Sequence, residues 1–552
     1  MRALTPRARA TLFVLLAGLV VGLLTAPRRL GDASTYVLAV SSLYADGDLT
    51  YAPADLARAQ TLQLDDLPNG LFLIHRDGQY VYGKPFLYPV AALPFYAVLG
   101  VRGFMAMNGL LLAALIVLGA DILSHRVAWR QALLISAIAF GFTVTPAYLY
   151  WIDPFLLCCA LVAAAIAAYR RDRPLLAAIP LALLAAVRAP YALLAITPAA
   201  VYLLSRRWRT LAYYVGGVVL VAAMLFGVEW ARTGSWAAYT GDRFYYVSAF
   251  PYQRGPDEPE VGIPSAVDVG RIQWPGLVDV LRRNGYFAVG RFAGVLPYFP
   301  TLRACLVWSR GWNCEKWIWL VALVATCQAL QLAMAYNPFG GRHALGNRLF
   351  VLLPVALVWV EAVRPTRWRL AATAVLLAVA VPVVGKPFYL SLHPGRQMLD
   401  VPYRYLPFEW PDTPNINFPF QLGDMGALTA NQYHWEDGAV WTRGGTTADF
   451  VMFRRYDQQV RIRLWSLLPD ARVIDGDVLL PLDWQPGRDI DIVLSHPVAH
   501  FLDDRGGGDR YDVYRLRIAT DDGTPASSVG SRNDNRFVGV LVRPLPHPPP
   551  AQ

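Results

Sequence analysis

Charged residues stand at the edges of several long apolar runs in this sequence, where a charge is costly unless it is paired or hydrated. Asp32 follows the first apolar run, in "RRLGDASTY", and Tyr36 comes one helical turn later. Asp153 lies in "YWIDPF", just before Pro154. A carboxylate in such a place can accept a proton from a nucleophile. It can equally cap a helix, because the helix dipole favours an acidic group at the N-terminus.

Cations stand at comparable places in three other short segments. These segments are "YGKPFLYP", "AAVRAPYA" and "NPFGGRHALGNRLF", and their candidate residues are Tyr82, Lys84, Arg188, Arg342, His343 and Arg348. Lysine and arginine both bind phosphate, and arginine does so with a planar fork of donors. Each long cation could instead extend to the lipid head groups, so both interpretations stay open at this point.

The composition indicates a polytopic membrane protein. Of the 552 residues, 55% are hydrophobic and 16% are charged, whereas soluble domains carry about 25% charged residues. The net charge of +10 does not indicate nucleic-acid binding, because the arginines cluster between apolar runs as membrane topology requires. The five cysteines lie in or beside apolar segments, without metal-ligand spacing, so neither a disulfide framework nor a metal site is expected.

The apolar runs predict eleven membrane-spanning helices and a cytoplasmic N-terminus. The first, 10–26, is interpreted as an uncleaved span, because Pro27 makes a signal-peptide cleavage site unattractive. The run 85–100 contains three prolines and is predicted to be re-entrant or interfacial. All strong basic clusters then fall on the cytoplasmic side. The other predicted spans are 104–123, 131–149, 152–169, 174–187, 189–204, 211–230, 294–309, 316–336, 347–363 and 368–385.

This topology divides the chain into a transmembrane domain over 1–385, a proline-rich linker over 386–432 and an extracytoplasmic domain over 433–545. The transmembrane domain has a first outer loop with interfacial helices (27–103) and a second large outer loop (231–293), and all the candidate residues above fall on the outer face. Alternating stretches such as "QQVRIRLWS" and "YDVYRLRIA" predict that the last domain is an all-β sandwich. Its aromatic residues, Tyr433, Trp435 and Trp441, either stack on sugars or pack in the core.

Four motifs carry a resemblance to a known family. "GDASTY", "YGKPFLYP", "WIDPF" and "VRAP" stand in the order of the family motifs "DE-x-Y", "HKPPLYYW", "TPDA" and "TKGP". Residues 1–390 thus resemble the GT-C superfamily of polyprenyl-phosphate-sugar-dependent glycosyltransferases, with protein O-mannosyltransferase-like and aminoarabinose lipid A transferase-like enzymes nearest in pattern. The chain departs from the motifs at Ala33, Gly83, Phe86 and Arg188, where the family has an acid, a histidine, a proline and a lysine.

The resemblance implies transfer of a sugar, with inversion, from a polyprenyl-phosphate lipid donor to a lipid, glycan or protein acceptor. Asp32 would activate the acceptor, Asp153 would line the cavity as a second acid, and Lys84 and Arg188 would bind the lipid phosphate. The outer-face argument, rather than the family, adds Arg342, His343 and Arg348 as substrate-binding candidates. Tyr36 and Tyr82, which lie beside Asp32 and Lys84 in the sequence, complete the substrate-binding set.

No cofactor or metal is expected, because a phosphate leaving group needs only cationic stabilisation. The implied location is the bacterial plasma membrane, with membrane lipids as surroundings and the C-terminal domain in the periplasm or outside the cell. Two other functions stay open. One is a transporter or flippase of lipid-linked sugars, which usually shows internal repeats that this sequence lacks. The other is a non-catalytic, glycan-binding assembly protein of the cell envelope.

Overall fold

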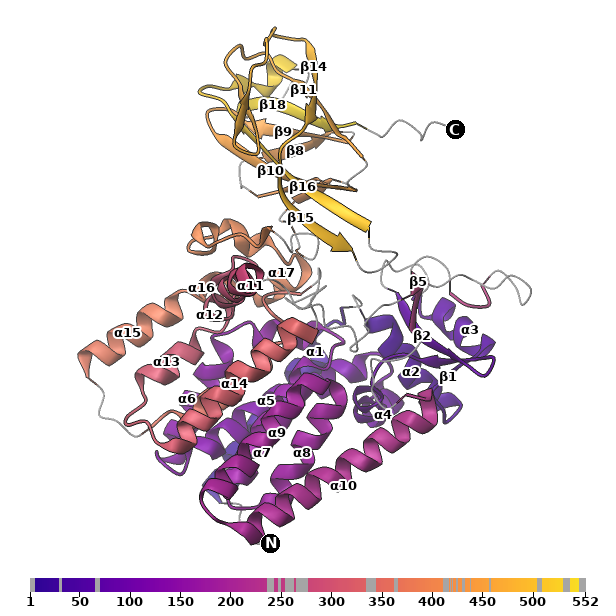
Figure 1. Ribbon diagram of the computed structural model, residues 1–552, viewed down its shortest axis with the longest axis vertical. Coiled ribbons are helices and arrows are strands. Elements are labelled where there is room, and N and C mark those ends of the chain that lie inside the picture. Colours follow the sequence, from indigo (N-terminus) through magenta and orange to yellow (C-terminus); the bar gives the residue numbers. More distant parts are fainter. Residues whose placement is uncertain are drawn as a thin grey trace. The chain divides into compact units, whose positions relative to one another are not determined.

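The chain forms two compact units in the computed structural model (Figure 1). Unit 1 is Met1–Val289 with Ala293–Leu392, and unit 2 is Gly290–Phe292 with His393–Gln552. The division after Leu392 lies seven residues beyond the predicted end of the transmembrane domain. The structure describes residues 5–28, 32–64, 70–235, 243–246, 250–253, 263–264, 277–333, 344–361, 366–410, 416, 418, 420–422, 425–428, 432–436, 438–455, 458–503, 509–529 and 537–545.

Unit 1 is mainly helical. Its α-helices are α1 (Pro6–Leu24), α2 (Ala33–Ala45), α3 (Pro53–Thr61), α4 (Leu87–Leu99), α5 (Arg102–Leu123), α6 (Trp129–Gly141), α7 (Phe155–Arg170), α8 (Pro174–Val187), α9 (Ala192–Leu204), α10 (Trp208–Thr233), α11 (Leu277–Val289), α12 (Val295–Tyr298), α13 (Thr301–Val307), α14 (Cys314–Ala333), α15 (Arg367–Ala378), α16 (Val381–Val384) and α17 (Pro387–Leu392). Three short 3-10 helices are η1 (Thr145–Tyr150), η2 (Ala189–Tyr191) and η3 (Leu353–Val358). Among the described helices, α1, α5 and α10 are long and apolar enough to cross a membrane.

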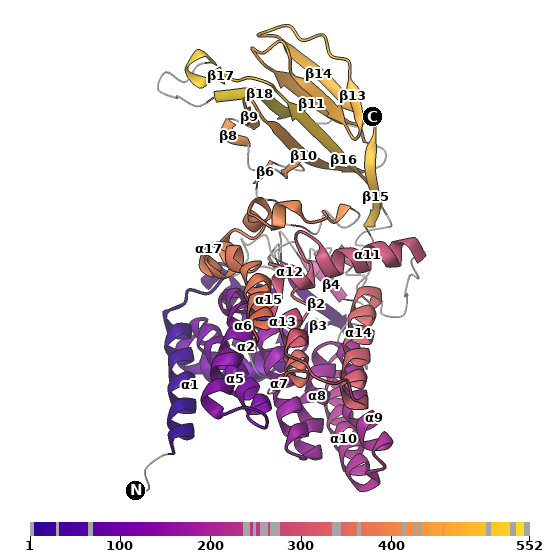
Figure 2. The same ribbon diagram turned by 90° about the vertical axis from the view of Figure 1, so that its left-hand side faces the viewer.

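The first helix packs on α5 through a small-residue seam (Figure 2). Gly18 and Gly22 are four residues apart in α1, and both approach the backbone of α5. A Cβ on Gly22 would come within 2.3 Å of the Met105 carbonyl oxygen, and one on Gly109 within 2.1 Å of the Gly18 oxygen. Such small-xxx-small spacing lets membrane helices pack closely. Much of the rest of α1 is exposed and apolar, as in Phe13 and Leu24, which suits contact with lipid.

Three predicted segments of unit 1 can be compared with the structure: the run 85–100 agrees with the prediction that it does not cross the membrane, and the other two differ. The run 347–363 is no continuous helix but contains η3 in an almost fully buried stretch, an arrangement that protein must surround if it lies at membrane depth. The run 85–100 contains α4, whose 13 residues span about 20 Å and are too short to cross a bilayer. The predicted interfacial helix after Asp32 is α2, which is buried from Ala33 to Ser42.

A small antiparallel sheet positions Lys84, one of the candidate residues. Its strands are β1 (Thr50–Tyr51), β2 (Leu71–Arg76), β3 (Gln79–Tyr82), β4 (Arg243–Tyr246) and β5 (Ile263–Pro264), in the order β1-β3-β2-β4-β5. Asp77 and Gly78, both with positive φ, form the turn between β2 and β3, as expected for an Asp-Gly hairpin. Gly83 continues the ladder by donating its N–H to Phe72. Lys84 therefore projects from the end of a defined hairpin.

Basic clusters that were predicted to face the cytoplasm gather at one end of the bundle. Asp121, at the end of α5, pairs with Arg7 from the start of α1 and with Arg171 from the α7–α8 turn. Asp172 in the same turn pairs with Arg207, which precedes α10. The other end of α1 is about 28 Å away. There, Arg28 forms a backbone bridge with Trp151, two residues before Asp153.

Unit 2 contains two antiparallel sheets around a shared core. One has the order β13-β12-β16-β10-β7-β6 with β15 beside β16, and the other has the order β14-β11-β18-β9-β8 with β17 beside β18. The bounds are β6 (Phe420–Leu422), β7 (Met425–Ala427), β8 (Gln432–Glu436), β9 (Ala439–Arg443), β10 (Thr447–Arg455), β11 (Val460–Trp465), β12 (Arg472–Asp475), β13 (Val478–Leu480), β14 (Asp489–Leu494), β15 (Pro497–Asp503), β16 (Asp509–Ala519), β17 (Thr524–Pro525) and β18 (Phe537–Pro544). Phe450 and Leu516 of the first sheet and Ile462 and Val542 of the second share one hydrophobic cluster.

The predicted linker contributes to this region, because β6 and β7 come from it and join the first sheet. It also contains the 3-10 helices η4 (Arg396–Leu399) and η5 (Tyr403–Tyr405). Trp441 is 5% exposed and packs with Ala526 and Val538, so its ring belongs to a small core. The side chains of Tyr433 and Trp435 lie outside the described part of the chain.

Candidate active site

An ion pair between Asp32 and Lys84 lies at the centre of the candidate site. Lys84 Nζ donates to Asp32 Oδ2 at 2.9 Å, and the two side chains are 8% and 12% exposed. Asp32 occupies the N-cap position of α2 but makes no side-chain capping bond. Its main-chain oxygen does accept the N–H of Tyr36. The carboxylate is therefore directed to a residue 52 positions away rather than to its own helix.

Neighbouring groups fix the position of Lys84. Its Nζ lies 3.9 Å from the ring centroid of Phe72, an electrostatically favourable place for a cation. Arg232, on α10, donates to the carbonyl oxygens of Tyr82 and Lys84 and pairs with Glu229 at 2.6 Å. The hairpin end that carries Lys84 is thus tied to α10 through main-chain acceptors.

Asp153 and Arg348 form a second pair. Arg348 Nη1 lies 3.4 Å from Asp153 Oδ2, and neither side chain is more than 13% exposed. The other carboxylate oxygen of Asp153 accepts the N–H of Phe155 at 2.9 Å, at the start of α7. The sequence left capping and a catalytic role as alternatives for Asp153. In the structure one oxygen caps the start of α7 and the other pairs with Arg348.

The segment that carries Arg348 is held mostly by its backbone. Tyr148, on η1, donates its hydroxyl to the Leu345 oxygen at 2.9 Å, and Tyr191, on η2, donates to the Leu349 oxygen. Asn347 is fully buried and accepts the N–H of Leu349 at 2.9 Å. The 3-10 helices η1 and η2, which precede α7 and α9, therefore supply the two tyrosine hydroxyls that hold this turn.

Two functional candidates were missed by the sequence analysis. Asn108 is buried in α5 and donates to the Trp151 oxygen at 2.7 Å, so it holds the segment just before Asp153. The sequence did offer a signal for Asn108, because a single side-chain amide inside a 22-residue apolar helix indicates a hydrogen bond to a neighbouring segment. Arg243, on β4, is 4% exposed, and its guanidinium lies 5.1 Å from the Phe72 ring. It lies within electrostatic reach of Lys84.

These residues form one electrostatic cluster. Asp32 interacts with Lys84, Arg348 and Arg188, and Arg348 interacts with Asp153, Asp32 and Arg188. Arg188 is 9% exposed and stands in an extended conformation between α8 and η2. Among the described residues, Lys84, Arg188 and Arg348 thus act on the carboxylate of Asp32, and Arg243 acts on Lys84. Such a set of cations suits an anionic ligand, because charge-assisted hydrogen bonds to an anion are strong.

The charges shift the protonation of the central pair. Burial alone would raise the pKa of Asp32, but Lys84, Arg348 and Arg188 outweigh it and hold that pKa well below its ordinary range. Burial lowers the pKa of Lys84 to about 8, helped by Arg243 and opposed by Asp32. In the part of the chain that is described, the Nε of Arg348 is buried and has no hydrogen-bond partner. An anion entering the cluster would meet this donor.

Other predicted residues lie differently. Tyr36 packs edge-on against Tyr88 at 5.1 Å within the core next to the cluster. Tyr82 is buried with its ring centroid 6.0 Å from that of Tyr51, and its hydroxyl lies near Asp55 on α3. The candidates Arg342 and His343 lie outside the described residues.

The structure explains one departure from the family motifs. A Cβ on Gly83 would lie 3.0 Å from both Cγ and Cδ of Arg243. The family's histidine could not occupy this position without displacing that arginine. As to metal ligands, no group of three or more His, Cys, Asp or Glu side chains suited to a metal occurs within the described ranges.

Comparison with known proteins gives distant structural similarities. No family model matches the chain, and no curated protein matches it either. The chain is similar to the crystal structure of ArnT from Cupriavidus metallidurans bound to undecaprenyl phosphate, with a TM-score of 0.43 and 13% identity over 73% of this chain and 68% of that chain. It is also similar to the arabinofuranosyltransferase AftD from Mycobacteria, with a TM-score of 0.38 and 18% identity.

The second similarity covers 71% of this chain but only 27% of AftD. AftD is a glycosyltransferase by name, which is the class of enzyme that the sequence resembles. Because both TM-scores are below 0.5, the activity of this chain has to be inferred from its own residues.

Proposed function

We propose that this chain is an integral membrane glycosyltransferase of the GT-C type, which transfers a sugar from a polyprenyl-phosphate donor to an extracytoplasmic acceptor with inversion. The observation that carries the proposal is the buried cluster in which the cations Lys84, Arg188, Arg243 and Arg348 lie with the carboxylates Asp32 and Asp153. Such a cluster can neutralise a phosphate while keeping a carboxylate beside it.

The cations would serve the donor. Lys84 and the arginines would bind the phosphate that links the sugar to the lipid, because charge-assisted hydrogen bonds to phosphate are strong. The same cations would stabilise the charge that builds on this phosphate as the bond to the sugar breaks. This role needs no metal ion, and the proposal includes none.

The chemical step would be a direct displacement. The acceptor oxygen forms a bond to the anomeric carbon, and the bond from that carbon to the phosphate oxygen breaks, with its electron pair leaving on the phosphate. The acceptor's proton passes to the carboxylate of Asp32. In the free protein, Lys84 holds Asp32 ionised and weakly basic. The donor phosphate would compete for Lys84 and so raise the basicity of Asp32 at the moment it is needed.

Mass spectrometry of envelope glycans tests this function. A strain without the gene should lose one sugar modification from a lipid, glycan or protein, and the intact gene should restore it. Asp32→Asn should restore less than about 1% of it, because the amide keeps the size of the carboxylate but cannot accept the proton. Asp46→Asn is the matched control, since Asp46 pairs with Arg58 in the same outer loop, away from the cluster.

Purified protein in detergent separates transfer from lipid translocation. An enzyme releases polyprenyl phosphate from its donor when acceptor is present, whereas a flippase needs two bilayer leaflets to show its activity. Full restoration of the modification by a well-expressed Asp32→Asn protein would refute the role of this carboxylate.

A further inference from the structure

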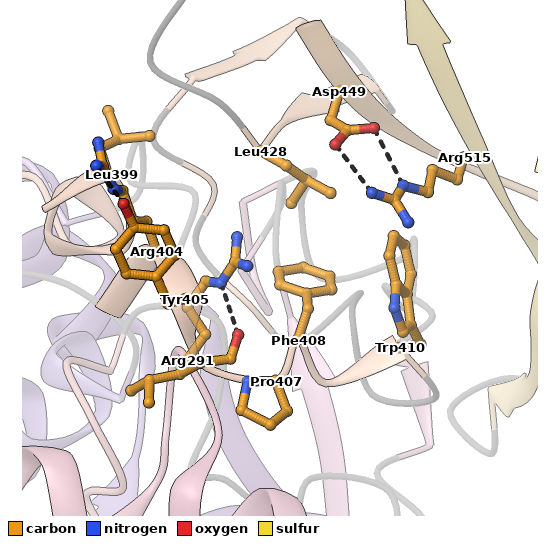
Figure 3. Close-up of a pocket in the computed structure, with 11 residues that line it drawn as sticks. Arg291, Leu399, Arg404, Tyr405, Pro407, Phe408, Trp410, Leu428, Asp449 and Arg515 are labelled. Atoms are coloured by element: carbon orange, nitrogen blue, oxygen red, sulfur yellow. Dashed lines mark hydrogen bonds and ion pairs between the residues drawn. The ribbon is translucent and has the colours of Figure 1, made fainter. Parts of the chain in front are cut away.

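A cavity of about 530 Å³ lies wholly within unit 2 (Figure 3). Its walls come from four places: Arg291 in the short segment Gly290–Phe292, the stretch 399–410, Leu428 just after β7, and β10 with β16. The N–H of Arg291 donates to the Pro407 oxygen at 2.8 Å, and its Nε donates to the Leu406 oxygen, which anchors the first wall to the second. Ligand cavities in proteins commonly hold about 300–1,000 Å³.

The cavity is rich in positive charge. Three arginines, Arg291, Arg404 and Arg515, line it together with one carboxylate, Asp449. Arg515 binds Asp449 through two contacts, 3.1 Å from Nε and 2.9 Å from Nη2. Asp449 also accepts a hydrogen bond from Arg517, which lies on β16 like Arg515. The single carboxylate is thus shared by two arginines, and the lining keeps a positive excess.

Each lining arginine also lies close to an aromatic ring. Arg515 is 5.4 Å from the ring centroid of Trp410, and Arg291 is 5.7 Å from that of Phe408. The ring centroids of Phe408 and Trp410 are 4.8 Å apart in an edge-on arrangement, and the two rings are neighbours in the lining of the cavity (Figure 3). At the rim, Arg404 lies 4.7 Å from the ring of exposed Tyr405.

We propose that this cavity binds an anionic saccharide, a sugar that carries a carboxylate or phosphate. Flat aromatic faces suit the apolar C–H face of a pyranose ring, while a guanidinium fork matches the geometry of a carboxylate or phosphate. The lining combines both features within one volume of suitable size. A purely apolar ligand would make no use of the guanidinium groups, and a free small anion would leave the aromatic faces unused.

The site is independent of the proposed transfer reaction. Every lining residue belongs to unit 2, whereas Asp32, Lys84 and their partners belong to unit 1. The cavity could therefore hold a glycan even if the chain transferred no sugar. It also differs from Trp441, one of the aromatic residues that the sequence pointed to, because that ring packs in a small core instead.

Calorimetry on the full-length protein in nanodiscs of neutral lipid tests the proposal. Trigalacturonic acid is expected to bind at least ten times more tightly than galactotriose, which has similar rings without the carboxylates. Arg404→Ala should weaken binding of the charged sugar at least fivefold. Because this side chain is exposed, its removal should leave folding unchanged. Trp410→Ala should weaken binding of both sugars, because it removes a stacking surface.

Arg463→Ala supplies a matched control. Arg463 forms the same two-point contact with Asp491, at 2.7 and 3.0 Å, on the other sheet of unit 2 and outside the cavity. It should bind trigalacturonic acid like the unchanged protein. Equal affinity for the charged and neutral sugars would overturn the proposal. So would binding of inorganic phosphate as tight as that of trigalacturonic acid, or binding unaffected by both Arg404→Ala and Trp410→Ala.

Discussion

The carboxylate of Asp32 stands at the N-terminus of α2 yet pairs with Lys84 instead of capping the helix. The sequence could predict that Asp32 is charged, that it follows the first span and that it lies on the outer face of the membrane. It could not choose between capping and pairing, because the partner lies 52 residues further along the chain. Arg243 was missed for the same reason, since only the pairing of β4 with β2 brings it to Phe72 and Lys84.

The low pKa of Lys84 gives the first prediction at this scale. At about 8, against an ordinary 10.5, this pKa makes the side chain neutral as the pH rises through 8. We therefore expect kcat/KM for the donor to fall about tenfold per pH unit above 8, because the phosphate loses a cation. Lys84→Arg should move the fall to higher pH, since arginine stays charged. Rates measured from pH 6 to 10 on both proteins test this.

Unfolding of the protein does not account for the expected fall of kcat/KM above pH 8. Between pH 8 and 10.5 the unfolded chain binds more protons at Lys84 than the folded chain does, so the contribution of Lys84 to stability rises with pH there. Thermal unfolding recorded over the same pH range supplies the control. Identical pH profiles for the two proteins would show that Lys84 does not titrate during the reaction.

Secondary-structure elements were predictable where a local signal existed. The Asp-Gly pair at 77–78 has the sequence of a tight hairpin turn and forms one, which sets the exit of Lys84. The run 347–363 was wrongly predicted as a span, because a continuous apolar stretch does not distinguish a helix from a buried irregular segment. Pro354 falls within this run, at the start of η3.

Asn108 gives a prediction at the scale of elements. Its amide joins α5 to the Trp151 carbonyl, and Asn108→Ala leaves that acceptor without this donor. We expect a loss of stability of about 1–3 kcal/mol. We also expect at least a tenfold loss of transfer activity, because the segment that positions Asp153 loosens. The melting temperature and the initial rate of the purified variant measure the two effects.

Ser136→Ala is the matched control for Asn108→Ala. Ser136, on α6, donates to the Ile116 oxygen of α5 at 2.7 Å, so it also links two elements by a buried hydrogen bond, but away from the cluster. It should reduce stability and leave the rate nearly unchanged. If both variants lost stability and neither lost activity, Asn108 would have only a structural role.

At the scale of the whole molecule, the periodicity of the sequence predicted the strands but not the contacts between them. The two alternating stretches quoted for the C-terminal region, "QQVRIRLWS" and "YDVYRLRIA", form β11 and β16, and each strand lies in one of the two sheets. Alternation identifies strands because one face of each is buried, as in the pattern of β11. It does not specify which strands pair, and the cavity beside Trp410 depends on that pairing and on the distant segment 290–292.

Membrane orientation is predicted by the gathering of basic clusters around Asp121 and Asp172. We expect this end of the bundle to face the cytoplasm. A cysteine at Ser205, an exposed residue beside Arg207, should resist a membrane-impermeant maleimide in intact spheroplasts and react after lysis. A cysteine at exposed Gln60 should react in both.

The exposed native Cys314 has to be replaced by serine first, because it would react at the same end as Ser205. The buried cysteines can stay. Labelling of Ser205→Cys in intact spheroplasts, with Gln60→Cys protected until lysis, would reverse the proposed orientation.

The turn that carries Arg348 has a consequence for how such a protein can diverge. Tyr148 and Tyr191 hold it through the main-chain oxygens of Leu345 and Leu349, and every amino acid supplies such an oxygen. Substitutions at positions 345 and 349 therefore leave these two bonds intact. The residues around this arginine can therefore change during evolution while its guanidinium keeps its position, so the three-dimensional site can persist after the local sequence motif is lost.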